Sequence, residues 1–152
     1  MHPNCAVVDA ALRAAGVPGR VQILDEPAPT AAAAAAQIGC GIGAIANSLL
    51  FATVENTPLL VLTSGSHRVD TTRVAALVGT AELRRARPDF VLWYTGQPIG
   101  GVAPVGHPSP IPTFVDTALD RYQQVWAAGG IPRAVFPTTF VPRESIGRAP
   151  RT

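Results

Sequence analysis

Apolar and polar residues recur along this chain with two periods, one typical of helices and one typical of strands. Between Cys5 and Ala15 the apolar side chains return every three or four residues, and Gly16 and Pro18 follow, which predicts a first helix. Thr30 precedes six alanines, so we expect it to cap a second, short helix.

The clearest strand pattern lies in the middle of the chain. Residues 46–51 and 58–63 favour strands, and the polar residues 55–57 between them favour a turn, which together predict a hairpin. The second of these strands is apolar on both faces, as in a strand covered on both sides. Shorter strands are predicted at 21–24, 84–86, 113–115, 124–127 and 133–136.

Two further helices are predicted from their caps. Asp70 precedes a helical pattern that runs to Val78 and ends at Gly79, and Asp89 precedes a short one that runs to Trp93. Residues 140–152 contain two prolines and little periodicity, so we expect an irregular tail. The order of elements predicts one α/β domain over residues 1–152, with a mixed, strongly curved, barrel-like sheet surrounded by short helices.

The composition limits which side chains are available for catalysis or metal binding. The chain has 152 residues, 47% of them hydrophobic and 14% charged, with a net charge of +2, which is typical of a globular protein. All twelve basic residues are arginine, so a lysine amine is not available for catalysis. Cys5 and Cys40 belong to no metal-binding spacing and no disulfide framework. We therefore expect a cytoplasmic protein without metal or cofactor, which binds neither DNA nor a membrane.

The most distinctive stretch is residues 100–107, Gly-Gly-Val-Ala-Pro-Val-Gly-His, called the glycine loop below. Adjacent glycines let backbone N–H groups approach a ligand closely, and Pro104 restricts the path of the chain beyond them. A tight corner between two strands would use the same residues. The loop therefore predicts either a binding site or a corner.

Five blocks of sequence, taken in order, resemble the YbaK family, the prolyl-tRNA-synthetase-associated editing domains that deacylate mischarged tRNA. The resemblance extends from the first predicted helix to Thr138. The blocks are residues 43–51 (GAIANSLLF), 62–65 (LTSG), 71–75 (TTRVA), the glycine loop (GGVAPVGH) and 125–130 (VWAAGG).

This resemblance implies the reaction and its partners. Family members hydrolyse the ester between a wrong amino acid and the terminal adenosine of tRNA, which requires a positioned water and donors for the developing oxyanion. It implies that Gly100 and Gly101 face this ester and the terminal ribose. Asn47 stands where family enzymes usually carry a lysine, so it is the third candidate catalytic residue. The expected partners are the acceptor end of mischarged aminoacyl-tRNA and a synthetase.

Further candidates surround these three. Residues expected to shape the substrate pocket are Ser48, Thr63, Ser64, Pro104, Gly106 and His107. His107 could bind substrate or relay a proton, or it could pair with a nearby backbone group. His67 follows a strand end and is a weaker candidate. A serine-hydrolase triad is not indicated, because Thr63 and Ser64 have no adjacent histidine and carboxylate in sequence.

Two groups of arginines could contact tRNA phosphates: Arg68 with Arg73, and Arg84 with Arg85. At a net charge of +2 a solvated surface would explain them equally well.

Two functions remain open from the sequence. The first is a trans-acting aminoacyl-tRNA deacylase. The second is a catalytically weak or inactive module of the same fold that binds aminoacyl-tRNA or a synthetase, because asparagine brings no positive charge to position 47. A metal hydrolase has no supporting ligand spacing.

Overall fold

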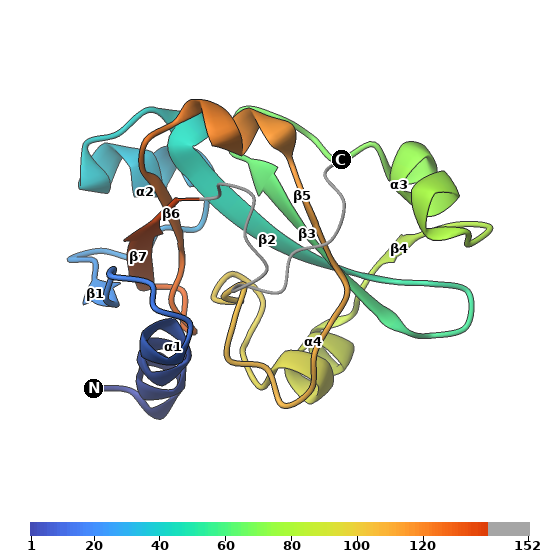
Figure 1. Cartoon of the computed structure of the whole chain (residues 1–152), viewed down its shortest axis with the longest axis horizontal. Coiled ribbons are helices and arrows are strands. Elements are labelled where there is room, and N and C mark those ends of the chain that lie inside the picture. Colours follow the sequence, from blue (N-terminus) through green and yellow to red (C-terminus); the bar gives the residue numbers. More distant parts are fainter. Residues whose placement is uncertain (140–152) are drawn as a thin grey trace.

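A long antiparallel hairpin forms the centre of the fold (Figure 1). The computed structural model describes residues 1–139, so the irregular tail expected at 140–152 lies outside the described residues. Strands β2 (Ile45–Ala52) and β3 (Pro58–Ser64) pair from Ala46 opposite Ser64 to Ala52 opposite Pro58. Asn56 in the turn has a φ of 64°, a left-handed conformation that asparagine tolerates better than most residues. The predicted hairpin is confirmed.

The other strands extend this hairpin into a seven-stranded mixed sheet. They are β1 (Gln22–Ile23), β4 (Arg84–Arg85), β5 (Thr113–Val115), β6 (Val125–Ala128) and β7 (Ala134–Thr138). The order is β1-β7-β6-β2-β3-β5, with β4 paired to β2 off this path. The pairs β2–β6 and β3–β5 are parallel, whereas the others are antiparallel, so the predicted mixed α/β fold is confirmed.

The barrel-like closure that we expected is not confirmed. Within residues 1–139 the path of paired strands ends at β1 on one side and at β5 on the other. These end strands are only two and three residues long, and each pairs with a single neighbour. Closure would need them to pair with each other, so the sheet remains open.

Short helices surround the sheet, with sequence-encoded caps. They are α1 (Pro3–Ala14), α2 (Ala31–Ile38), α3 (Thr71–Val78) and α4 (Pro88–Thr95), with 3-10 turns η1 (Ile42–Ala44) and η2 (Thr117–Arg121). The Thr30 side chain accepts from the Ala33 N–H at 3.1 Å, and Asp70 accepts from the Arg73 N–H at 3.0 Å. Both predicted caps are confirmed.

The predicted start of α4 is wrong. Arg87, not Asp89, occupies the N-cap position, and Pro88 is the first helical residue. Proline suits this position because its missing N–H would have no partner there and its φ is already helical. Asp89 lies in the first turn, and the helix continues past Trp93 to Thr95.

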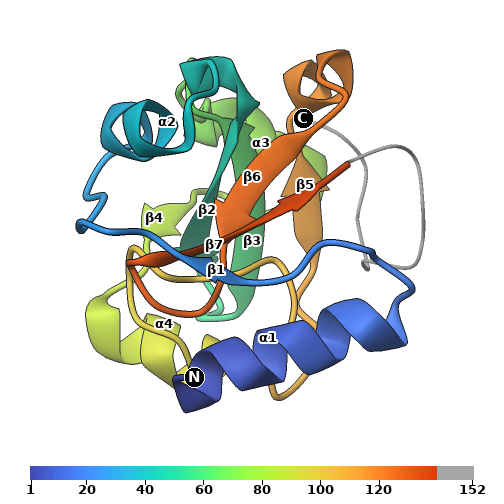
Figure 2. The same cartoon turned by 90° about the vertical axis from the view of Figure 1, so that its left-hand side faces the viewer.

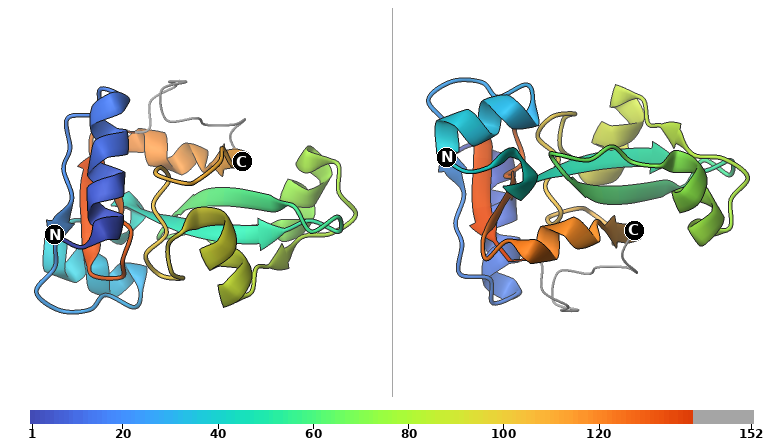
Figure 3. Two further views of the ribbon diagram at one scale, coloured as in Figure 1. Left: turned by 90° about the horizontal axis from the view of Figure 1, so that it is seen from below. Right: turned by 90° about the horizontal axis from the view of Figure 1, so that it is seen from above.

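Alternation along the hairpin separates two hydrophobic clusters. Leu50, Leu60 and Leu62 face a cluster shared with α1 and α4, whereas Phe51 and Val61 face a cluster shared with α3. Figure 3 shows α3 and α4 flanking the outer half of the hairpin from opposite sides, and Figures 2 and 3 show α1 and α2 on opposite sides of β6 and β7. The side chains of successive β2 residues therefore point to opposite faces of the hairpin.

Candidate functional site

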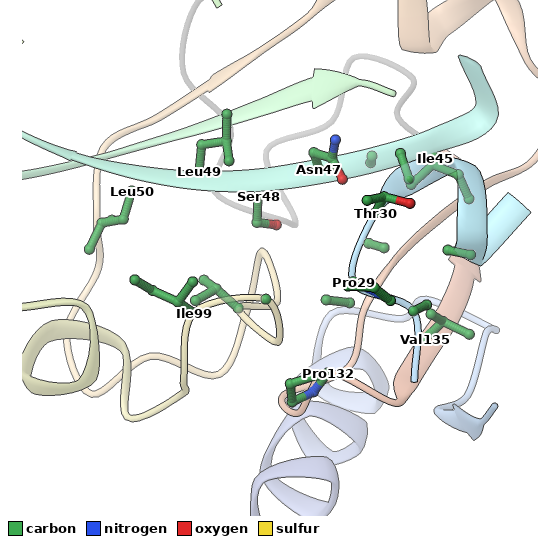
Figure 4. Close-up of a pocket in the computed structure, with 18 of the residues that line it drawn as sticks. Pro29, Thr30, Ile45, Asn47, Ser48, Leu49, Leu50, Ile99, Pro132 and Val135 are labelled. Atoms are coloured by element: carbon green, nitrogen blue, oxygen red, sulfur yellow. The ribbon is translucent and has the colours of Figure 1, made fainter. Parts of the chain in front are cut away.

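A cavity of about 280 Å³ lies along the edge of β2, between the places where β6 and β4 pair with that strand. Figure 4 shows its walls, which come from β2, the start of α2, the glycine loop and the segments around β6 and β7. Apart from Gly100, its lining is apolar except at Thr30, Asn47, Ser48 and Arg85. A mostly apolar pocket with a few polar groups is typical of a site for a small ligand.

Ser48 and Asn47 leave β2 on opposite sides, although both line the cavity. Figure 4 shows the Ser48 side chain directed toward Ile99, whereas Asn47 points away from Ile99 on the other side of the strand. The strand register agrees, because residues paired across an antiparallel ladder have their side chains on the same face. Ser48 is paired with Leu62, which faces the cluster shared with α1 and α4, whereas Asn47 is paired with Thr63 on the opposite face. Ser48 is therefore on the side of β2 that faces the glycine loop.

The Ser48 hydroxyl is buried and has no hydrogen-bond partner within residues 1–139. An unpaired buried hydroxyl costs free energy, and native structures usually provide a partner for it. A polar group in this state at the wall of a cavity indicates a position where a ligand or water completes the hydrogen bonding.

The two adjacent glycines have different environments. Gly100 lines the cavity with a φ of 86°, and its N–H donates to no residue in the described part of the chain. The Gly101 N–H donates to the Pro98 carbonyl at 2.9 Å, and Gly101 is outside the cavity lining. A Cβ on Gly101 would lie 2.5 Å from backbone atoms of Ile131. The structure thus leaves the Gly100 N–H available to a ligand and uses Gly101 for close packing.

Gln97 supports the glycine loop from inside the protein. Its side chain is 2% exposed, accepts from the Ala103 N–H at 2.7 Å and donates to the Val105 carbonyl at 3.3 Å. The Thr95 hydroxyl in turn bonds to the N–H and the carbonyl of Gln97. This buried network holds both halves of the loop against the end of α4. Sequence reasoning missed Gln97, since a single glutamine before a proline gives no signal of burial.

The other candidate residues of the glycine loop, Pro104, Gly106 and His107, lie outside the cavity lining. His107 Nε2 is 2.8 Å from the Ala103 carbonyl, and because a carbonyl can only accept, Nε2 carries the proton. Burial lowers the pKa of His107, and the hydrogen bond to Ala103 opposes that effect only in part, so the ring is neutral at pH 7. Gly106 packs against Val7 and Val8 of α1, and Pro104 is buried.

Asp116, the N-cap residue of η2, gathers Thr63, Ser64 and His67 around itself. It accepts from the Thr63 hydroxyl at 3.3 Å and from the Ser64 N–H at 3.1 Å, and its Oδ2 lies 2.7 Å from His67 Nδ1. Its other oxygen accepts from the Ala118 N–H at 2.9 Å. Neither Thr63 nor Ser64 lines the cavity beside Ser48, so the structure does not bring them to Gly100.

These bonds determine the charge state of Asp116. Burial alone raises the pKa of its carboxyl group, but the N–H groups of Ala118 and Ser64 and the nearby His67 ring more than compensate. The pKa of Asp116 therefore lies below its ordinary value, and the group is ionised at neutral pH.

The four candidate arginines do not lie at one site. Arg85 is the only charged residue that lines the first cavity within the described chain, and its guanidinium carbon lies 5.8 Å from the centroid of the Phe51 ring. Arg84 lies 3.9 Å from Glu82 and is outside that lining. Arg68 and Arg73 line a separate cavity of about 270 Å³ beside Asp116.

Residues 1–139 hold neither a cluster of metal-binding side chains nor a membrane-spanning helix. They contain no group of three histidine, cysteine, aspartate or glutamate residues placed to hold a metal ion. Over the same range, no helix has the length and apolar character needed to cross a membrane.

Comparison with known sequences and structures identifies similar proteins. Residues 25–140 match the sequence profile of the aminoacyl-tRNA editing domain. The uncharacterized protein YwhH of Bacillus subtilis (strain 168) is 33% identical over 97 residues, which are 64% of this chain and 61% of that protein. The chain thus spans less than two thirds of this curated relative.

Two solved structures resemble the chain over nearly its full length. One is a proposed trans-editing enzyme for prolyl-tRNA synthetase, which is 38% identical, has a TM-score of 0.89, and matches over 99% of this chain and 96% of its own. The other is the hypothetical protein APE2540, which is 30% identical with a TM-score of 0.84, over 95% of this chain and 97% of its own.

Gly101→Ala should destabilise the protein by about 1–3 kcal/mol, because the added methyl group overlaps the Ile131 backbone. Gly41→Ala is the matched control, since Gly41 has a φ of −71° and open space around its Cβ position. Urea unfolding of both variants measures the difference. Equal stability of the two variants would contradict the tight contact.

Asp116→Asn should lower the free energy of unfolding at pH 7 by about 1–3 kcal/mol, because an amide cannot accept from every donor around the carboxylate. The lowered pKa means that this contribution is complete above about pH 4 and is lost as the pH falls below that value.

Urea unfolding at a series of pH values checks this, with the exposed Asp89→Asn as a control expected to stay within about 0.5 kcal/mol of the unsubstituted protein. A difference between Asp116→Asn and the unsubstituted protein that stays constant into the acid range would show that the charge of Asp116 is not responsible.

Proposed function

The chain belongs to the aminoacyl-tRNA editing domain family, and from this premise we propose that it is a trans-acting deacylase that hydrolyses the ester of mischarged aminoacyl-tRNA. The similarity to a proposed trans-editing enzyme for prolyl-tRNA synthetase supports this reading. On this proposal the protein works in the cytoplasm on the acceptor end of tRNA, alongside a synthetase.

One observation carries the proposal: two residues that line the same mostly apolar cavity keep a polar group without a partner in residues 1–139, the exposed Gly100 its N–H and Ser48 its buried hydroxyl. Ester hydrolysis places negative charge on the carbonyl oxygen in the transition state, and a fixed N–H donor in an apolar surrounding stabilises that charge. Removing one such donor from an enzyme costs roughly 3 kcal/mol of transition-state stabilisation.

The proposed reaction needs only water as a second reactant. The oxygen of water bonds to the ester carbonyl carbon, the bond from that carbon to the ribose oxygen breaks, and the ribose oxygen takes up a proton. The products are the free amino acid and uncharged tRNA. On this proposal Gly100 holds the developing oxyanion, and Ser48 positions the aminoacyl group.

The residues that line the described cavity include no carboxylate, imidazole or thiol. Because His107 is committed to the Ala103 carbonyl, it is not placed to act as a base there. We therefore propose that the free hydroxyl of the terminal ribose orients the attacking water. Such substrate assistance explains how a pocket with few reactive side chains can promote hydrolysis.

Arg85 provides the positive charge of the site on this proposal. No carboxylate pairs with it in the described chain, and the ring of Phe51 and the pairing of β4 with β2 limit its movement. An arginine in this state is suited to a phosphate of the tRNA end, since guanidinium binds phosphate oxygens through two N–H groups.

Purified protein should hydrolyse at least one of alanyl-, cysteinyl-, seryl- and threonyl-tRNA well above the spontaneous rate, as measured by release of the labelled amino acid. A folded protein that turns over none of the four would refute the catalytic proposal.

A binding module is the second candidate, because Asn47 brings no charge to the place where the resemblance implies a lysine. Asn47→Lys separates the two candidates. Activity that appears only in this variant would favour the binding module, whereas activity already present in the unsubstituted protein favours the deacylase.

Arg85→Gln should weaken tRNA binding and reduce the slope of log affinity against log salt by about one, the value expected for one phosphate contact. Arg84→Gln is the matched control, because Arg84 is the neighbouring residue, lies near Glu82 and does not line the cavity. Filter binding at several salt concentrations measures both variants. The phosphate contact is excluded if the two slopes are equal.

A further inference from the structure

Strand β2 has one fully paired edge and one edge that is paired only at its ends. β3 covers the first edge from Ala46 to Ala52. On the second edge, β6 pairs with Ile45 and Ala46, and β4 pairs with Phe51 and Ala52. The residues between these two short strands have no strand beside them, and the cavity occupies that gap.

The direction of the backbone groups in this gap follows from the alternation of a strand. The Ile45 carbonyl accepts from the Gly65 N–H on the β3 side, whereas the Leu50 carbonyl accepts from the Ala86 N–H on the other side. Odd-numbered residues of β2 therefore bond toward β3, and even-numbered ones turn toward the second edge. Ser48 is the even-numbered residue between the two paired ends, so its N–H and C=O point into the gap.

Ser48 thus presents three polar groups to one cavity: the backbone N–H, the backbone carbonyl and the unpaired hydroxyl. In an antiparallel sheet, a residue in this orientation exchanges two hydrogen bonds with the N–H and C=O of a single residue opposite. An open edge of this kind recognises extended main chain in many peptide complexes. Here the start of α2 and the glycine loop wall the gap, so its occupant is small.

We propose that the open edge at Ser48 binds the main-chain atoms of the substrate's amino acid, with the Ser48 carbonyl accepting from the α-ammonium group and the Ser48 N–H donating to the ester carbonyl. This inference rests on the proposed function and specifies its substrate class. The α-amino group and the carbonyl carry the donor and acceptor that a paired residue would supply. The site is therefore specific for esters with a free α-amino group, whatever their side chain.

The first test uses two non-hydrolysable analogues and the full ¹⁵N-labelled chain. In 3′-alanylamino-3′-deoxyadenosine an amide replaces the ester, and 3′-propionylamino-3′-deoxyadenosine differs only by lacking the α-amino group. The alanyl analogue should bind at least about tenfold more tightly, since a hydrogen bond to a charged group is lost in the other. It should also shift the Ser48 amide resonance in the NMR spectrum.

Equal affinity of the two analogues, no binding of either, or an unchanged Ser48 amide signal on saturation would overturn the inference. These outcomes are independent of turnover. A protein that hydrolyses aminoacyl-tRNA but binds both analogues equally would keep the proposed function and lose this inference.

A pair of proline variants tests the edge itself. Ser48→Pro removes an N–H that no strand uses, so the protein should fold cooperatively but bind both analogues several-fold more weakly, because each presents a carbonyl to that N–H. Leu49→Pro is the matched comparison, because its N–H belongs to the ladder with β3, and it should be strongly destabilised. A folded Ser48→Pro protein with undiminished affinity for the alanyl analogue would refute the role of the N–H. If Ser48→Pro is destabilised as strongly as Leu49→Pro, the second edge tolerates proline no better than the paired one, and the open edge is refuted.

Discussion

The pairing of β2 is the constraint on which the rest of this structure depends. Because β3 takes up one edge completely, every second residue of β2 must find its backbone partners on the other edge. β6 and β4 supply them only at the two ends of the strand. The gap between them is where the cavity lies, so the site results from an incomplete sheet and is not an addition to a complete one.

Two buried polar side chains hold the surrounding loops in place. Gln97 bonds to the backbone in both halves of the glycine loop, and Asp116 joins the end of β3 to η2 through four hydrogen bonds. Buried groups of this kind are expensive when unpaired, so a satisfied network favours one arrangement of the loops over others. On the proposed function, this arrangement would keep Gly100 and Ser48 in a constant relation across the cavity.

The elements of this fold could largely be predicted, whereas the environment of the candidate residues could not. Thr30, Asp70 and the turn around Asn56 act on neighbours within a few residues, so their consequences can be read locally. The opposite directions of Asn47 and Ser48 depend on the register with β3. Likewise, the contact of Gly101 with Ile131 and the bond between Gln97 and Ala103 arise only when the chain is folded.

The sequence by itself determined the mixed α/β class, the central hairpin, most helix caps and the resemblance to an editing domain, because each rests on local periodicity or on short ordered motifs. Only the tertiary structure decided that Arg85 shares a cavity with Ser48 and Gly100, and that Thr63, Ser64 and His67 gather around Asp116 instead. The physical reason is that these groupings depend on strand register, where a shift of one residue exchanges the two faces of a strand.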